Sequence, residues 1–237
     1  MTDVKALAQE RQQMFVNVYR GKIPTRIPIN SILSLEACIE YAGANQAEVL
    51  WDMTKAEPIF EKVNTDFPAD TPAGGTRRYP SFYQILGSRP FVMSSEGVMQ
   101  HPNVQGMEPE DYDDFIAAPY DTMIEKIYPR LYTELDTDPN TKALILAKAM
   151  RAHGDEFALL AQIGARMRAK FGFASIPSSA TTAPFDFLAD FLRSFTGICS
   201  DIRRYPDKVI AACEALTPIL IKKGKLPVRS EERRVGK

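Results

Sequence analysis

Short β-type runs separated by long helical stretches set the strongest limit on what this chain can fold into. Three or four such runs can be found in 237 residues, at 26–30, within 63–80, at 91–93 and at 173–177. Strands that alternate with long helices are typical of α/β proteins with parallel pairing. A complete (β/α)8 barrel requires eight strands in about 250 residues. The sequence therefore predicts an α/β fold with about three to four βα units and no complete barrel.

Apolar periodicity and end signals predict the helices between these runs. The helix expected at 4–20 has apolar residues at helical spacing, Asp3 as its cap and Gly21 as its end. Another helix begins at Asn45 with a capping-box pattern, and Pro58 should kink or interrupt it. Further helices are expected at 34–42, from 109 onward with breaks near 119 and 129, and at 140–170, 184–197 and 206–221.

The composition excludes several classes of function. With 29 Lys and Arg against 30 Asp and Glu, the net charge is −1, which gives no electrostatic reason to expect nucleic acid as a partner. No apolar run approaches the roughly 18 residues of a membrane span, and the polar N-terminus is not a secretory signal. We therefore expect a cytoplasmic protein that acts on a small-molecule substrate, with neither nucleic acid nor a membrane as partner.

The cysteine and histidine content bears on redox compartment and metals. Cys38, Cys199 and Cys213 are too few and too irregularly spaced for a disulfide framework, and they fit a reducing compartment. The sequence has no CxxC, HxC or HExxH motif, and its two histidines are His101 and His153. No metal site and no bound cofactor are therefore predicted within this chain.

The near-neutral charge is an average over two different parts. Residues 222–237 contain seven basic and two acidic residues, whereas the other 221 residues contain 22 basic and 28 acidic ones. Such a basic segment, with almost no apolar content, is typical of disorder. The sequence therefore predicts a folded part at 1–221 and a disordered or non-native tail at 222–237.

Four stretches resemble the uroporphyrinogen decarboxylase (URO-D) superfamily. QERQQMFVNVYRGKIPTRIPI (9–29) is similar to its leader helix, its G-K-x-P-D-R turn and its first strand. TTAPFDFLADFLRSF (181–195) is similar to a strand-to-helix turn of the family, and RRYPDKVIAACEALTPIL (203–220) to the helix that follows. FVMSSEGVMQHPNVQGMEPEDYDDFI (91–116) resembles the branch related to corrinoid-dependent methyltransferases.

The resemblance spans about 9–222 and implies a TIM barrel, of which this chain would be the N-terminal half. It implies methyl transfer between a corrinoid protein and a small donor or thiol acceptor. In that branch a His-x-Cys zinc site lies in the second half of the barrel, so zinc and corrinoid are implied only for a longer protein. The alternatives are decarboxylation of a tetrapyrrole, as in porphyrin biosynthesis, and an inactive fragment.

Two departures from the family favour methyl transfer over decarboxylation. True decarboxylases carry an arginine-rich turn after the first strand to hold substrate carboxylates, but the corresponding stretch at 30–37 contains no arginine. The family's substrate-contacting tyrosine falls on Asp190.

The catalytic candidates are Asp70, Asp66 and His101. The family places an essential aspartate after its second strand, and Asp70 is the first choice for this position, with Asp66 second. A carboxylate there can accept several hydrogen bonds from a substrate, although a simple turn aspartate is the alternative. His101 lies in a polar turn where an imidazole could carry a proton, or have no chemical role.

The substrate-binding candidates are two aspartates and two arginines. Asp186 and Asp190 are four residues apart near the start of a predicted helix, so they should share a face. They could meet substrate or only stabilise the helix dipole. Arg77 and Arg78 follow two glycines and could bind an anion, or lie solvated in a flexible loop.

Overall fold

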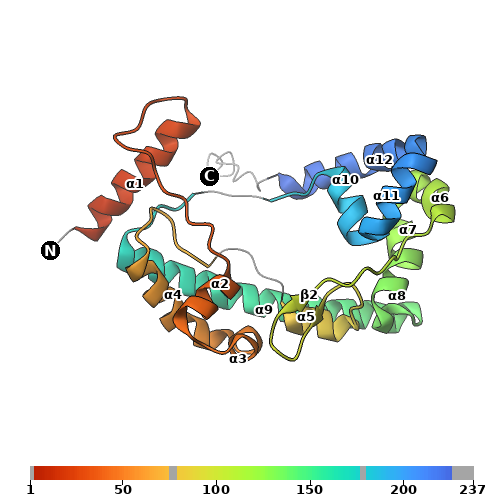
Figure 1. The fold of residues 1–237 in the computed structure, drawn as a ribbon, viewed down its shortest axis with the longest axis horizontal. Helices are drawn as coiled ribbons and strands as arrows, with labels where there is room; N and C mark the ends of the chain where they lie inside the picture. Colours follow the sequence, from red (N-terminus) through yellow and green to blue (C-terminus); the bar gives the residue numbers. More distant parts are fainter. Residues whose placement is uncertain (1–2, 75–78, 177–179, 226–237) are drawn as a thin grey trace, which may run out of the picture. The chain divides into compact units, whose positions relative to one another are not determined.

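The computed structural model describes residues 3–74, 79–176 and 180–225, and it is predominantly helical (Figure 1). Helices make up 69% of it, and the described residues contain only two short strands, β1 (Val92–Met93) and β2 (Met99–Gln100). These strands pair antiparallel, with Val92 opposite Gln100. No βα repeat occurs in the described ranges, so the predicted α/β fold with part of a (β/α)8 barrel is wrong.

The chain divides into two compact units. Unit 1 comprises Met1–Pro102 and Tyr132–Ile176, and unit 2 comprises Asn103–Leu131 and Pro177–Lys237. The predicted division at 222 falls within α12 (Pro206–Gly224), and the rest of that segment after 225 lies outside the described residues. Over the part of the chain that is described, every helix is too short or too polar to cross a bilayer.

Unit 1 is built on α9 (Pro139–Phe171), a helix of 33 residues whose ends follow local signals. The Asp138 carboxylate accepts hydrogen bonds from the N–H groups of Asn140 and Thr141, which caps the first turn. Gly172 ends the helix at φ 66, a left-handed conformation that glycine adopts without strain. The predicted helix at 140–170 is thus confirmed. The other helical elements of unit 1 are α1 (Val4–Tyr19), α2 (Leu35–Ala42), α3 (Gln46–Trp51), η1 (Met53–Lys55), α4 (Ala56–Asp66), α5 (Pro80–Leu86) and η4 (Thr133–Leu135).

The apolar core of unit 1 is formed by α2, α3, α4 and the C-terminal half of α9. Its largest buried members include Leu35, Ile39, Leu50 and Ile163. Pro58 does not interrupt a longer helix as predicted, because the helix after Asn45 ends at Trp51. Pro58 instead lies in the first turn of α4, where its missing N–H group costs no intrahelical hydrogen bond.

Three of the predicted β-type runs form no strand in their described residues, although a few backbone hydrogen bonds join them. The N–H group of Asp70 donates to the Ile29 carbonyl (2.9 Å), and that of Gly74 donates to the Leu33 carbonyl (3.1 Å). On the other side, the Ala174 N–H group donates to the Asp70 carbonyl (2.8 Å). From the first of these hydrogen bonds to the second, the donor moves from Asp70 to Gly74 and the acceptor from Ile29 to Leu33. The segments 29–33 and 70–74 therefore run in the same direction. Prolines at 24, 28, 68 and 72 remove backbone donors, which leaves the pairing too sparse for a regular ladder.

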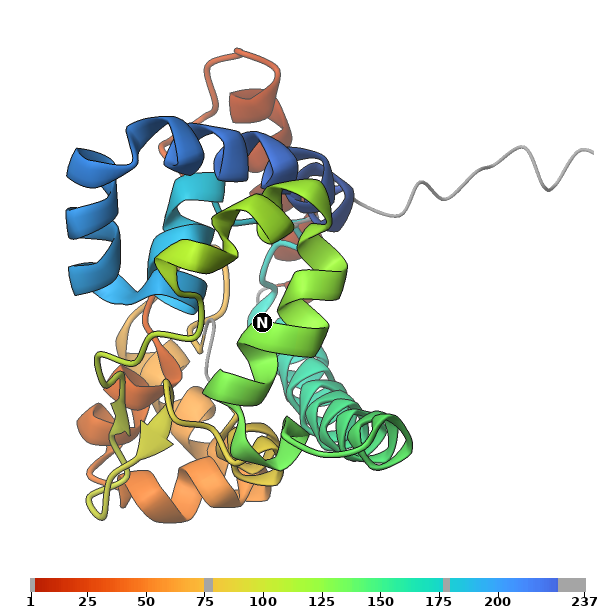
Figure 2. The ribbon, with the colours of Figure 1, turned by 90° about the vertical axis from the view of Figure 1, so that its right-hand side faces the viewer.

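Unit 2 is mainly helical and contains no strand in its described residues. Helix α12 packs against α6 (Tyr112–Ala117), α10 (Pro184–Phe187) and α11 (Ser194–Arg204), as Figure 2 shows. The predicted helix at 206–221 is confirmed, but the one predicted at 184–197 is split by a π-helical segment, η5 (Leu188–Arg193). Ser194 follows it with a positive φ of 63. The remaining elements are η2 (Pro109–Asp111), α7 (Pro119–Thr122), the π-helical η3 (Met123–Ile127) and α8 (Tyr128–Leu131).

Candidate functional site

Asp70 lies at the centre of a polar cluster between the extended segments of unit 1. Its side chain is 2% exposed, yet both carboxylate oxygens are satisfied. Arg26 donates from Nη1 to Oδ2 (2.7 Å) and from Nη2 to Oδ1 (2.6 Å), and the Ile29 N–H group donates to Oδ2 (2.7 Å). The Nε atom of Arg11 lies 3.0 Å from Oδ1, within ion-pair distance but not aligned for a hydrogen bond.

The two arginines of this Arg11–Arg26–Asp70 cluster differ in their surroundings. Arg11 projects from α1 and donates from Nη1 to the carbonyls of Phe171 (2.7 Å) and Gly172 (3.1 Å) at the end of α9. Arg26 lies in the loop after α1, and its side chain is 48% exposed. Two guanidiniums surround one carboxylate, so the cluster carries a net charge of +1, and Arg26 presents this charge to solvent.

The charged state of the cluster follows from its hydrogen bonds. The Arg26 guanidinium holds the pKa of Asp70 below its usual value, against burial, which acts to raise it. The same contact raises the pKa of Arg26. Because each group stabilises the ionised form of the other, Asp70 is an anion throughout the neutral range and is not a proton donor there.

Two exposed apolar residues lie near Arg26 in the sequence. Ile23 is 96% exposed and Ile27 is 84% exposed, on either side of Arg26 in the sequence. Nearby, the Thr71 hydroxyl donates to Asn30 Oδ1 and accepts from the Ser31 N–H group, both at 2.8 Å, which fixes the extended segment. An exposed guanidinium with exposed isoleucines close to it in the sequence suits an anionic ligand that also has an apolar body.

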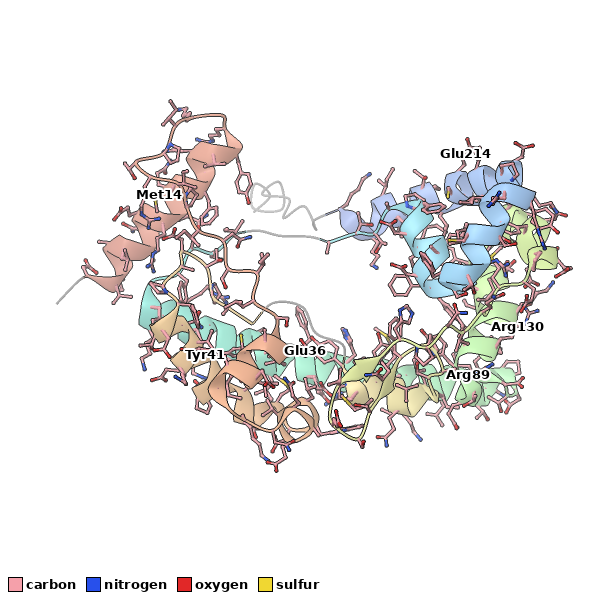
Figure 3. All side chains as sticks on the ribbon, viewed as in Figure 1. Met14, Glu36, Tyr41, Arg89, Arg130 and Glu214 are labelled. Carbon is pink, nitrogen blue, oxygen red and sulfur yellow. The ribbon has the colours of Figure 1, made fainter. Side chains whose placement is uncertain are left out.

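The structure places Asp66 outside this cluster. It is the last residue of α4 rather than a residue at a strand end, as the sequence predicted. Its carboxylate accepts from the hydroxyl of Tyr41 on α2 (3.0 Å; Tyr41 is labelled in Figure 3) and from Lys62 Nζ (2.7 Å). Both hydrogen bonds lower the pKa of Asp66, and the one from Lys62 has the larger effect. This arrangement links the ends of two helices.

His101 follows β2 and stacks on an aromatic ring. Its imidazole lies 4.5 Å from the ring centroid of Phe91, with an interplanar angle of 13°. The other histidine, His153 on α9, is partly buried against the rings of Tyr79 (4.7 Å) and Phe82 (5.7 Å).

The predicted substrate-binding residues are not brought to the Asp70 cluster by any described contact. Asp186 on α10 and Asp190 on η5 are both exposed in unit 2. The π-helical segment that begins at Leu188 changes the helical turn between them, so the expected regular i, i+4 relation is altered. Arg77 and Arg78 lie outside the described residues.

Unit 2 contains a buried ion pair that was not predicted from the sequence. Arg193 donates from Nε to Asp201 Oδ2 (2.5 Å) and from Nη2 to Oδ1 (3.0 Å), and it also donates to the Met107 carbonyl. The Tyr112 hydroxyl donates to Asp201 Oδ2 (2.8 Å), and burial raises the pKa of this tyrosine. The available signal was a lone arginine in the apolar stretch FLRSF, eight residues before an aspartate. We call this group the Arg193–Asp201–Tyr112 cluster.

The Arg193–Asp201–Tyr112 cluster is a packing feature and not a binding site. Arg193, Asp201 and Tyr112 are each at most 2% exposed. Ser194, directly after Arg193, has the strained backbone conformation of a positive φ.

No group of three or more His, Cys, Asp or Glu side chains that could hold a metal ion occurs among residues 3–74, 79–176 and 180–225. The zinc implied by the family resemblance therefore has no ligand set in these ranges. No family model, curated protein or solved structure matches the chain.

Proposed function

We propose that this chain is part of an enzyme of the URO-D superfamily, of the methyl-transferring branch, and that Arg26 binds the anionic group of its small substrate. The resemblance of four stretches, in the family's order and spacing, supports the family. The half-exposed guanidinium of Arg26, with exposed isoleucines at 23 and 27 in the same loop, supports an anionic substrate with an apolar part. The enzyme acts in the cytoplasm, in keeping with its three free cysteines.

One observation favours methyl transfer over tetrapyrrole decarboxylation: both carboxylate oxygens of Asp70 already accept hydrogen bonds from the protein. A decarboxylase of this family would use an aspartate to accept pyrrole N–H groups. The oxygens of Asp70 already accept three hydrogen bonds and face two cations. Asp70 is therefore a positioning residue that fixes Arg26, and it does not contact the substrate.

In this proposal a corrinoid protein is the partner that carries the methyl group. Arg26 orients the small donor or acceptor through its anionic group, and Arg11 and Asp70 hold Arg26 in place. No step is assigned to a metal, since the described residues contain no ligand set for one.

The decarboxylase alternative is favoured by one observation, the cationic character of the cluster. Arg26 and Arg11 provide guanidiniums that the stretch 30–37 lacks, and a tetrapyrrole substrate has many carboxylates. Only Arg26 is exposed enough to meet one of them, because Arg11 is committed to Asp70 and to the end of α9.

The substitution Arg26→Gln should weaken binding of hexanoate by about tenfold or more, because a charge-assisted hydrogen bond to the ligand is lost. Isothermal titration calorimetry with acetate, butyrate and hexanoate measures this, and affinity should rise with chain length. Arg203→Gln, which removes an arginine from α11 in unit 2, is the matched control and should bind as the parent chain does. Equal affinities for Arg26→Gln and the control would contradict an anion site at Arg26.

An activity assay separates the alternatives. We expect the chain, mixed with methylcobalamin and 3-mercaptopropionate, to remove the methyl group from cobalt, seen as a change in the visible spectrum. Release of carbon dioxide from uroporphyrinogen would support the decarboxylase instead. Hexanoate binding without either reaction would support the inactive fragment.

A further inference from the structure

The loop between α1 and α2, residues 20–34, carries three isoleucines that are almost fully exposed. Ile23 and Ile27 belong to this group, and Ile32 is 86% exposed. A single exposed aliphatic residue is ordinary, but several in one short segment are typical of an interaction surface. Figure 1 shows the loop, which we call the α1–α2 loop, turning back at the end of α1.

Hydrogen bonds hold the first part of the α1–α2 loop at both of its ends. At its start, the N–H group of Lys22 donates to the carbonyl of Asn17 (2.8 Å), and Gly21 has a φ of 66, as in a Schellman turn. At its end, Arg26 is held by two hydrogen bonds to Asp70. Ile23 lies between these two anchors and is presented to solvent by an ordered backbone.

The α1–α2 loop is also cationic. From residue 11 to residue 35 the chain has four basic and no acidic residues. Two of the four belong to the Arg11–Arg26–Asp70 cluster, whose net charge of +1 is offset by Glu10, which acts on Arg26 more weakly than Asp70 does. The other two, Arg20 and Lys22, are exposed, and neither forms an ion pair within the described part of the chain. They give the loop a net charge of +2 beside its isoleucines.

We propose that the α1–α2 loop binds the surface of a bilayer that contains anionic phospholipids. Ile23 and Ile27 enter the boundary between headgroups and acyl chains, while Arg20 and Lys22 meet the headgroup phosphates. Apolar side chains at this depth, with cations at headgroup level, are the usual arrangement of a protein that lies on a membrane.

Binding at the surface is a different interaction from crossing the membrane. The sequence predicted no membrane partner because it has no apolar run long enough to span a bilayer, and the described residues contain no spanning helix. A surface loop needs neither. The inference does not depend on the proposed function, but the two are compatible, because a small anionic molecule with an apolar part also concentrates at a bilayer surface.

The charge of the loop disfavours a second copy of this chain as the occupant. In a symmetric dimer the same patch meets itself, so Arg20 and Lys22 of each copy would face those of the other. Such like-charge contacts oppose association, whereas anionic headgroups offer the opposite charge. The chain also bends at Thr25 and Arg26, and mobile lipids can adapt to a bent loop without a preformed pocket.

Cosedimentation of the 237-residue chain with vesicles tests the proposal. The chain should bind vesicles of phosphatidylcholine with about one third phosphatidylserine, and bind vesicles of phosphatidylcholine alone at least about tenfold more weakly. Added salt should weaken the binding, because the charges are exposed. Ile23→Asn/Ile27→Asn should lower the partition coefficient by about tenfold or more, since the inserted apolar groups are lost. Ile210→Asn, at an exposed isoleucine of α12, is the control and should bind as the parent chain does.

A second pair of variants tests the cations. Arg20→Gln/Lys22→Gln should lower the partition coefficient by about tenfold or more, at about fivefold for each charge. Arg203→Gln/Arg204→Gln removes two exposed charges from α11 and should have no effect. The Arg20→Gln/Lys22→Gln variant keeps Arg26 and should bind hexanoate as the parent chain does, so loss of lipid binding is distinguishable from failure of the anion site.

Tryptophan fluorescence tests insertion directly. Ile23→Trp, made with Trp51→Phe so that the chain keeps a single indole, should shift its emission to shorter wavelength when the phosphatidylserine vesicles are added. Ile210→Trp in the same background should show no shift. The proposal is overturned if the parent chain does not bind these vesicles, or if it binds them as well after Ile23→Asn/Ile27→Asn. It is also overturned if sedimentation equilibrium shows a dimer that this double variant abolishes, because the occupant is then a second copy.

Discussion

Replacing Asp201 with asparagine should lower the free energy of unfolding by about 3–5 kcal/mol, the cost of breaking a buried ion pair by removing one partner. Asparagine has nearly the shape of aspartate, so the change creates no cavity. It removes the closest counter-charge of the Arg193 guanidinium, which is 2% exposed, and leaves the more distant and half-exposed Glu108 carboxylate at 3.8 Å. It also exchanges the carboxylate that accepts from Tyr112 for a weaker acceptor.

Urea unfolding followed by far-ultraviolet circular dichroism measures this loss. Asp113→Asn is the matched control, because Asp113 pairs with Lys208 in the same unit but both are solvent-exposed. It should cost at most about 1 kcal/mol. The double variant Arg193→Met/Asp201→Asn should recover part of the loss, since the unpaired cation is removed as well. If Asp201→Asn costs no more than Asp113→Asn, the cluster does not stabilise the fold in this way.

Much of the helical structure could be predicted because its signals are local. The helix at 4–20 begins after Asp3, whose carboxylate accepts from Lys5 and Ala6, and it ends at Tyr19. The helix at 34–42 is capped by Ser34 and ends before Gly43 at φ 70. Caps and left-handed glycines act within one helical turn, so a single sequence is sufficient to find them.

The strands could not be predicted because pairing depends on distant residues. The runs at 26–30 and 173–177 were predicted as strands from their apolar character, but their described residues form no strand. A ladder also needs consecutive backbone donors on the partner, and Pro28, Pro68 and Pro72 interrupt them. The run at 91–93 forms β1, but its partner is the adjacent β2 and not a parallel strand.

The tertiary contacts of the candidate residues could not be predicted from the sequence either. Asp70 was singled out by its place after an expected strand. No local pattern indicated that Arg11, 59 residues earlier, and Arg26, 44 residues earlier, would contact it. Burial of an ionisable side chain is decided by tertiary packing. The roles assigned to Asp70, Asp66, His101, Asp186 and Asp190 accordingly stay predictions.

The substitution Asp70→Asn should destabilise unit 1 by about 2–3 kcal/mol, because it removes the only carboxylate within the Arg11–Arg26–Asp70 cluster. The figure is below that for a fully buried pair because Arg26 is half-exposed and water can compensate it. Trp51, the single tryptophan, lies in unit 1, so its fluorescence during urea unfolding reports on this unit. Asp66→Asn, at an exposed ion pair of the same unit, is the control and should cost much less than Asp70→Asn.

The contribution of Asp70 should also depend on pH with a definite sign. Its pKa in the folded chain lies below the unfolded value of about 3.9, so the folded state binds fewer protons near that pH. The stabilisation is fully present above about pH 4 and is lost as the pH falls through the folded pKa. The difference in unfolding free energy between the parent and Asp70→Asn should therefore be constant from pH 7 to about 5 and shrink below about 4. A difference that stays constant down to pH 2.5 would show that the charge of Asp70 does not stabilise the fold and that Arg26 is held by other contacts.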